Sequence, residues 1–230
     1  MSLQALAAEI LARRRGEGTF VVGLTGSVAA GKTTLASALA PALGEEVEIV
    51  STDGFLRPNA ELDARGLTLR KGFPETYDLA ALARALEEVR RGAARFPVYS
   101  HATYDVDPGA ARVIDRPPVL LIEGLALGLD RPPGPGQIDC LVYLDAAEAD
   151  LEAWFAARFM AFWEAAEHDS ASFYARFRNL DRAGAEALAR QVWAGVNLVN
   201  LREHIAPLRV HADVVALKAA DHSLASIVAR

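Results

Sequence analysis

The chain has 230 residues, 52% of them hydrophobic, and a formal net charge of −6 at pH 7. This length and hydrophobic content suffice for one sizeable core, and we expect a single domain over residues 1–230. The negative charge argues against nucleic acid or an anionic membrane surface as the main partner.

The sequence also indicates a cytoplasmic protein. Cys140 is the single cysteine, so no internal disulfide can form and a reducing compartment fits. The N-terminal residues lack the charged-then-apolar order of a signal peptide. No apolar run reaches the length that spans a membrane. We therefore expect a cytoplasmic protein with no membrane partner.

Hydrophobic periodicity predicts strands that alternate with helices along the chain. The expected helices cover residues 3–15, 33–43, 78–92, 148–167 and 181–203. The expected strands cover residues 19–25, 47–52, 95–100, 118–124, 140–145 and 212–218, and the last of them closes the sheet. A long polar segment at 53–78 and a turn at 132–136 connect some of these elements. This order predicts a three-layer α/β fold with a mostly parallel sheet, and a helical lid region within about 148–203.

The octapeptide GSVAAGKT at residues 26–33 matches the phosphate-binding pattern G-x4-G-K-[ST]. It lies between a predicted strand and a predicted helix, as a P-loop does in the P-loop NTPase fold. Backbone N–H groups at the helix N-terminus attract anions. We expect Lys32 to reach the β- and γ-phosphates of ATP and the Thr33 hydroxyl to bind Mg²⁺. The predicted nucleotide-binding residues are Gly26, Ser27, Val28, Ala29, Ala30, Gly31, Lys32, Thr33 and Thr34.

Two acidic residues are expected beside this loop. The helix after the P-loop runs roughly 16 Å away from the phosphates, and the next strand returns roughly 20 Å, which brings Asp53 back to the same edge. Glu123 ends the apolar run PVLLIEG and reaches that edge as well, because the strands are parallel. Asp53 is either the base that accepts the proton of an attacking hydroxyl or a turn residue. Glu123 either holds Mg²⁺, directly or through water, or is a solvated strand end.

The string VYSHATYD clusters Tyr99, His101 and Tyr104 after a predicted strand. Their donors and aromatic faces suit a small polar substrate, although a lone histidine is also compatible with a structural role. Arg158 lies among aromatic residues of a predicted helix and either reaches the transferring phosphoryl group or pairs with a carboxylate. For the asparagines of VNLVNL, at 197 and 200, the pattern alone favours a helix surface over substrate binding.

Several strings together resemble one family. They are GSVAAGKTT, STDGFLRPN, RGLTLRKGFPETYD, PVYSHATYDV, LLIEGL, WFAARF and VNLVNL, and the resemblance runs from about residue 19 to the end of the chain. The sequence is similar to the bacterial type I pantothenate kinases, within the phosphoribulokinase/uridine kinase group of P-loop kinases. This resemblance implies ATP-dependent phosphorylation of the primary hydroxyl of pantothenate, a step toward coenzyme A, and a homodimer formed through the helix after the P-loop.

The resemblance also implies roles for individual residues. Asp53 becomes the base, Lys32 and Thr33 serve ATP and Mg²⁺, and Arg158 stabilises the transferred phosphoryl group. The residues implied to bind substrate or adenine are Tyr99, His101 and Tyr104 in the pantothenate pocket, Asn197 or Asn200 on the substrate, and His222 near the adenine.

The chain departs from the family pattern at two positions. Phe155 stands where the family has a tyrosine that contacts pantothenate. Ser37 stands where the family has an arginine tied to the phosphate of coenzyme A, which leaves feedback inhibition by coenzyme A open. A related kinase acting on a sugar, glycerate or a nucleoside is therefore an alternative. A P-loop ATPase or nucleotide-dependent regulator is a third hypothesis, which the candidate base Asp53 disfavours.

Overall fold

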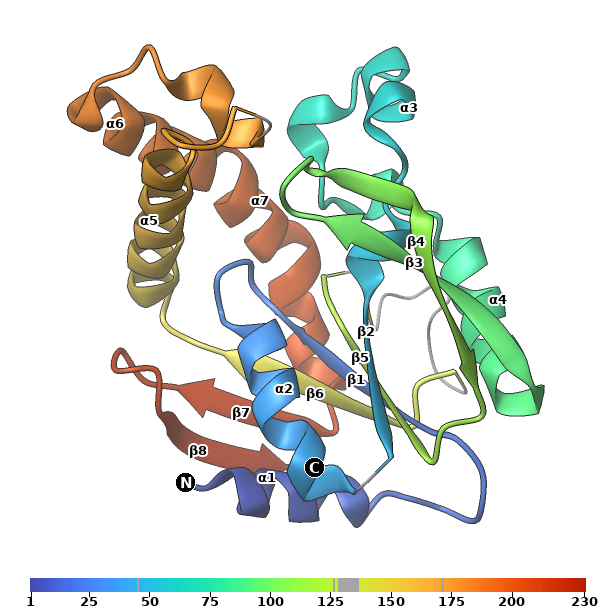
Figure 1. Cartoon of the computed structure of the whole chain (residues 1–230). Coiled ribbons are helices and arrows are strands. Elements are labelled where there is room, and N and C mark those ends of the chain that lie inside the picture. Colours follow the sequence, from blue (N-terminus) through green and yellow to red (C-terminus); the bar gives the residue numbers. More distant parts are fainter. Residues whose placement is uncertain (45, 126, 128–136, 171) are drawn as a thin grey trace.

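A computed structural model describes residues 1–44, 46–125, 127, 137–170 and 172–230, and its centre is a six-stranded sheet (Figure 1). The strand order is β2-β5-β1-β6-β7-β8. The first five strands of this order pair in parallel, and β8 pairs antiparallel with β7. Their bounds are β1 Phe20–Gly26, β2 Val47–Ser51, β5 Val119–Glu123, β6 Cys140–Asp145, β7 Val214–Lys218 and β8 Leu224–Ala229. The expected mostly parallel α/β architecture is confirmed.

Helices cover the sheet (Figure 1). The α-helices are α1 Leu3–Leu11, α2 Lys32–Leu43, α3 Asn59–Ala64, α4 Leu79–Arg91, α5 Glu148–Ala165, α6 Arg182–Val192 and α7 Leu198–Asn200. α2 packs on β1, β2 and β5, while α1 contacts α2, β7 and β8. α6 continues into α7 through a π-helical segment, Trp193–Asn197, and a second one, Leu201–Ile205, follows. The two long helices predicted near 148–167 and 181–203 are thus present.

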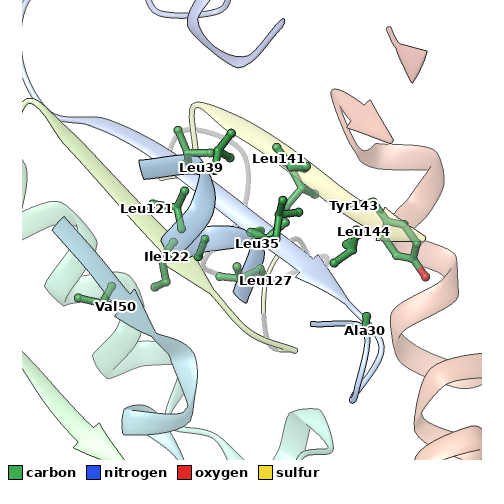
Figure 2. Close-up of a cluster of buried hydrophobic side chains, with 14 of the residues drawn as sticks. Ala30, Leu35, Leu39, Val50, Leu121, Ile122, Leu127, Leu141, Tyr143 and Leu144 are labelled. Carbon is green, nitrogen blue, oxygen red and sulfur yellow. The ribbon is translucent and has the colours of Figure 1, made fainter. Parts of the chain in front are cut away.

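The core lies where α2 meets the sheet (Figure 2). Leu35 and Leu39 project from α2 toward Leu121 of β5 and Leu141 of β6, and all four are buried. Every residue of β5 is buried because a central parallel strand is covered on both faces. This packing makes a rigid base for the loops at the carboxyl ends of β1, β2 and β5.

A separate ribbon of two antiparallel strands stands beside this sheet (Figure 1). It consists of β3, Ala93–Ser100, and β4, Asp105–Asp115. The predicted strand at 95–100 is therefore real, and its register shifts around Pro97, a residue that has no N–H for a ladder. Its partner β4 was not predicted, because its sequence DVDPGAARVID contains a Pro-Gly pair, shows no regular alternation and lies largely exposed.

Two further expectations change at the chain ends. The strand predicted at 212–218 corresponds to β7 but is not the edge strand of the sheet, because β8 pairs with it on the outer side. The helix predicted at 3–15 ends at Leu11. Beyond it Arg13 donates hydrogen bonds to the carbonyls of Asp213 at 3.0 Å and Arg230 at 2.9 Å, which ties this segment to the C-terminus. The turn predicted at 132–136 lies outside the described residues. In the described parts of the chain, every helix is too short or too polar to cross a bilayer.

Candidate active site

The loop between β1 and α2 has the geometry of a phosphate cradle. Gly31 caps α2 in a left-handed conformation, with φ +87°, and no side chain caps the helix N–H groups. Those N–H groups are therefore available to an anion. Lys32 folds back over the loop, and its Nζ donates to the carbonyls of Gly26 at 3.1 Å and Ser27 at 2.9 Å. The ammonium group is thus held inside the loop.

Lys32, Asp53 and Glu123 meet at the carboxyl edge of the sheet, as their strand positions predicted. Burial lowers the pKa of Lys32, while the carboxylates of Glu123 and Asp53 act in the opposite direction. Glu123 is 7% exposed, and burial raises its pKa against the influence of Lys32. The Thr33 hydroxyl donates to Glu123 Oε1 at 3.1 Å. This pair of oxygen donors beside the loop fits Mg²⁺, a hard cation that takes few protein ligands when phosphates and water supply the rest.

Asp53 begins the loop after β2, in the short 3₁₀-helix η1, Thr52–Phe55. The Ser51 hydroxyl accepts a hydrogen bond from the backbone N–H of Asp53 at 3.2 Å and caps this turn. The buried phenol of Tyr77 donates to Asp53 Oδ1 at 3.1 Å. Tyr77 belongs to the string KGFPETYD, which is fastened to the same loop through backbone hydrogen bonds from Arg57 to Thr76 and from Asp78 to Phe55, both 2.8 Å. The long polar segment therefore holds one carboxylate in place.

The end of the β3–β4 ribbon presents two tyrosines to this carboxylate. Tyr99 and Tyr104 have ring centroids 6.0 Å apart, and Lys71 Nζ lies over both rings, at 4.9 Å and 4.5 Å. Lys71 also donates to Asn59 Oδ1 at 2.6 Å and to the Tyr104 carbonyl at 2.5 Å. Burial raises the pKa of both phenols, that of Tyr104 to about 12, and Asp53 adds to the effect. Both phenols stay protonated and can donate to a bound substrate.

His101 and the two asparagines take different positions around this pocket. His101 is exposed at the tip of the ribbon, with its ring 5.1 Å from that of Tyr99. Asn200 is buried, and its Nδ2 donates to the Gly72 carbonyl at 2.8 Å, while its Oδ1 is buried with no partner among the described residues. Asn197 is partly exposed in the π-helical segment. Asn200 thus holds the KGFPETYD segment through Gly72, whereas Asn197 is the more exposed of the two asparagines.

Arg158 belongs to α5. Its side chain is exposed, yet its charge acts to lower the pKa of Lys32 and of Tyr104, so the guanidinium lies close enough to both to affect their charge. Arg158 thus lies near both the P-loop lysine and a ribbon phenol. It fits a cation that acts on a transferring phosphoryl group.

The other side of the P-loop carries an aromatic stack. His222, in the turn between β7 and β8, lies against Trp154 of α5 with ring centroids 4.4 Å apart and an interplanar angle of 30°. Lys218 of β7 lies over the same indole at 4.7 Å and donates to the Ala30 carbonyl of the P-loop at 2.7 Å. A flat aromatic surface next to the phosphate loop suits a nucleobase.

Sequence reasoning did not single out four of these residues: Lys71, Tyr77, Trp154 and Lys218. Lys71 and Tyr77 stand inside a string that the resemblance had quoted, but nothing in their spacing indicates which side chain they touch. Their partners lie 12 and 24 residues away in the chain.

A P-loop whose lysine meets two carboxylates, one of them facing a pocket of protonated phenols, defines a P-loop kinase that transfers a phosphoryl group to a hydroxyl. The profile of the phosphoribulokinase / uridine kinase family matches residues 21–158. The chain belongs to this family.

Individual relatives agree with this assignment. The chain is 40% identical over 242 residues to a pantothenate kinase of Leifsonia xyli subsp. xyli, spanning 99% of this chain and 74% of the relative. It is 40% identical over 227 residues to a pantothenate kinase of Rhizobium leguminosarum bv. trifolii, spanning 92% and 69%. A crystal structure from Silicibacter sp. TM1040, assigned as a fructose transport system kinase, is 30% identical with a TM-score of 0.74 and covers 90% of this chain and 95% of that one. The D-glycerate 3-kinase of Cryptococcus neoformans, with 14% identity, a TM-score of 0.69 and 99% coverage of both chains, shares the fold.

Proposed function

We propose that the protein uses MgATP to phosphorylate the primary hydroxyl of pantothenate. The observation that carries this proposal is that the charge of Asp53 acts both on the pKa of the P-loop lysine and on that of Tyr99, in a chain 40% identical to pantothenate kinases across most of its length. Coenzyme A synthesis is the pathway that such a reaction serves.

Each site residue has a part in this reaction. Asp53 accepts the proton of the acceptor hydroxyl as the hydroxyl oxygen attacks phosphorus, and Tyr77 keeps the carboxylate oriented. Lys32 and Arg158 compensate the negative charge on the transferring phosphoryl group from two sides. The remaining assignments are Tyr99, His101, Tyr104 and Asn197 on the acceptor, with Asn200 behind them, and His222 beside the adenine.

Thr33 and Glu123 are the residues that would hold Mg²⁺, which supplies charge neutralisation on the nucleotide phosphates when bound. The loop residues 26–34 would bind those phosphates through backbone N–H groups. Burial raises the pKa of Glu123, against the charge of Lys32, so protons and the metal compete for this carboxylate.

Residues of about 148–203 supply the lid in this proposal. The short 3₁₀-helix η4, Phe173–Phe177, meets the ribbon tip, where the Phe173 N–H donates to the Ala102 carbonyl at 3.1 Å and the Phe173 ring stacks on Tyr104 at 4.2 Å. These contacts cover the acceptor pocket, and water exclusion there strengthens every charge interaction inside. We further propose, from the family resemblance, that the enzyme works in the cytoplasm as one domain and as a homodimer.

A different hydroxyl acceptor is the second candidate, favoured by the 30% identity to the assigned fructose transport system kinase and by the absence of a hydroxyl at Phe155. The experiment is an ADP-release assay with MgATP and pantothenate, glycerate, fructose, ribose or uridine. We expect saturable, stoichiometric turnover with pantothenate, absent in Lys32→Ala. Turnover with another acceptor alone would reassign the pocket. ATP hydrolysis unchanged by every acceptor would instead support a P-loop ATPase.

A further inference from the structure

Tyr104 has a backbone conformation that a large side chain rarely adopts. Its φ is +56°, in the left-handed region, where Cβ crowds a neighbouring carbonyl oxygen and a bulky residue is an outlier. Such a conformation persists only where the surrounding contacts impose it. Because the same Cα carries the phenol ring, a change to negative φ would turn that ring away from Tyr99 and Phe173, whose ring centroids lie 6.0 Å and 4.2 Å away.

Contacts that hold this conformation come from Asn59, the first residue of α3, a helix that lies beside the ribbon (Figure 1). The side-chain Nδ2 of Asn59 donates to the Tyr104 carbonyl at 3.0 Å. The backbone N–H of Asn59 donates to Asp105 Oδ1, also at 3.0 Å. Asn59 is therefore bonded both to the left-handed residue and to the residue that follows it. These two bonds join parts of the chain that are 45 and 46 residues apart.

The hydrogen bonds at this position require an amide. Asn59 Oδ1 accepts from Lys71 Nζ at 2.6 Å, and the same ammonium donates to the Tyr104 carbonyl at 2.5 Å. The side chain at residue 59 thus donates to a carbonyl and accepts from an ammonium at once, which neither a carboxylate nor an aliphatic side chain can do. An asparagine near a helix start often caps its own helix, but the amide of Asn59 is bonded to the ribbon tip and to Lys71 instead.

We propose that Asn59 is a positioning residue for acceptor binding, whose amide keeps Tyr104 in the left-handed conformation that places its phenol in the acceptor pocket. This inference rests on the proposed function, because it takes the Tyr99–Tyr104 pocket as the acceptor site. The base Asp53 is held by other contacts, those with Ser51 and Tyr77. Acceptor binding should therefore depend on Asn59 more strongly than the rate of phosphoryl transfer does.

The test is steady-state kinetics of the full chain with Asn59→Leu, a change that removes the amide and roughly keeps the size of the side chain. We expect the acceptor KM to rise about tenfold, because the Tyr104 carbonyl loses one of its two donors. The kcat and the KM for ATP should stay within about threefold of wild type, a change of less than one hydrogen bond. The matched control is Gln4→Leu, which removes an exposed amide from α1 and should leave all three constants unchanged.

A double-mutant cycle separates positioning from a general structural role. Tyr104→Phe lacks the phenolic hydroxyl, so its acceptor KM should already be raised. Adding Asn59→Leu to it should change the acceptor KM by less than about threefold, because no hydroxyl is left to place. Should Asn59→Leu fail to fold, Asn59→Ala takes its place in the same cycle.

An unchanged acceptor KM in Asn59→Leu would overturn the inference, and so would effects of the two substitutions that multiply. A rise of equal size in the KM for ATP would overturn it as well, because that result indicates a structural role. Failure of the proposed function is seen separately, as absence of wild-type turnover with pantothenate. In that case the same cycle is measured with whichever member of the acceptor panel is turned over, and turnover with none of them would overturn both proposals.

Discussion

Tyr77 donates its phenolic hydrogen to Asp53 Oδ1 at 3.1 Å, from a side chain that is 3% exposed. The bond joins two loops that are otherwise held together by backbone contacts, and in the proposed reaction it would leave the second carboxylate oxygen of Asp53 for the acceptor. A phenol so placed acts through the carboxylate and does not contact the reacting atoms.

This relationship predicts the behaviour of Tyr77→Phe. Loss of a hydrogen bond to a carboxylate should lower kcat about tenfold while the acceptor KM changes little. Asp53→Asn should lower kcat by about 10²–10⁴ with little change in ATP affinity. In the Asp53→Asn background, Tyr77→Phe should have almost no further effect on kcat, because the two residues act as one unit. Independent, multiplicative effects would contradict the positioning role.

Lys71, whose ammonium lies over the Tyr99 and Tyr104 rings of the proposed acceptor pocket, predicts a pH dependence of acceptor binding. Burial lowers its pKa from 10.5 to about 8, against the pull of Asp105 and Asp53. As the pH rises through about 8 the ammonium loses its proton, so the KM of a carboxylate acceptor should increase. Lys71→Met should show a KM that is already high and no longer changes near this pH. In the unfolded chain the lysine keeps its proton to about 10.5, so this group's contribution to stability improves between those values. A wild-type acceptor KM that does not change between about pH 7 and pH 9 would contradict a role of the Lys71 ammonium in acceptor binding.

Glu123 predicts the metal requirement. Glu123→Gln keeps the shape of the side chain and the contact with Thr33 but removes the charge, so the Mg²⁺ concentration for half-maximal rate should rise at least about tenfold. Because burial raises the pKa of Glu123, the wild-type requirement for Mg²⁺ should also grow on acidification. Glu48→Gln, which alters an exposed carboxylate on β2 paired with Arg112, serves as the control and should leave the requirement unchanged. Titration of MgCl₂ at fixed ATP measures the Mg²⁺ requirement of the wild type and of the two variants.

Lys218 predicts a nucleotide-specific defect. Its ammonium joins the P-loop carbonyl of Ala30 to the Trp154 ring, so Lys218→Met should loosen the loop and the aromatic stack together. We expect the KM for ATP to rise roughly fivefold to tenfold, with an acceptor KM within twofold of wild type. A defect confined to the acceptor KM would contradict a role of Lys218 in nucleotide binding.

Gly124, directly after β5, has no room for a side chain. It has φ +156°, and a Cβ there would lie 1.7 Å from Thr52 Oγ1, beside the loop that carries Asp53. Gly124→Ala should therefore destabilise the fold by about 3 kcal/mol or more. Gly92→Ala is the matched control, because a Cβ at that position meets no atom within 4 Å, and its stability should change by less than about 1 kcal/mol. Urea denaturation followed by circular dichroism compares the two.

The central sheet and the P-loop could be predicted from the sequence because each depends on local patterns. The apolar runs of β1, β5 and β6 are continuous, as buried parallel strands require, and the glycine pattern of residues 26–33 is specific to one kind of loop. Knowing that the strands are parallel was then enough to bring Asp53 and Glu123 to the same edge.

The acceptor side was harder to predict because it is built from long-range contacts. β4 has neither alternation nor a buried face, and only its pairing with β3 makes it a strand. Lys71 reaches the Tyr104 carbonyl 33 positions away, so no spacing rule connects them. The roles of Tyr99, His101 and Tyr104 came from a resemblance of strings, and their assignment to substrate binding is a prediction.

The β3–β4 ribbon forms no ladder with the six-stranded sheet in the described part of the chain. In the proposed function, nucleotide chemistry and acceptor choice would therefore reside on two separate sheets, which are joined by side-chain contacts such as that of Arg112 with the Ile49 carbonyl. Substitutions at the ribbon tip break no backbone hydrogen bond of the six-stranded sheet. This separation makes the chain a practical scaffold for engineering: new acceptors can be sought by randomising the ribbon tip and η4 alone, while the phosphate-handling half is left as it stands.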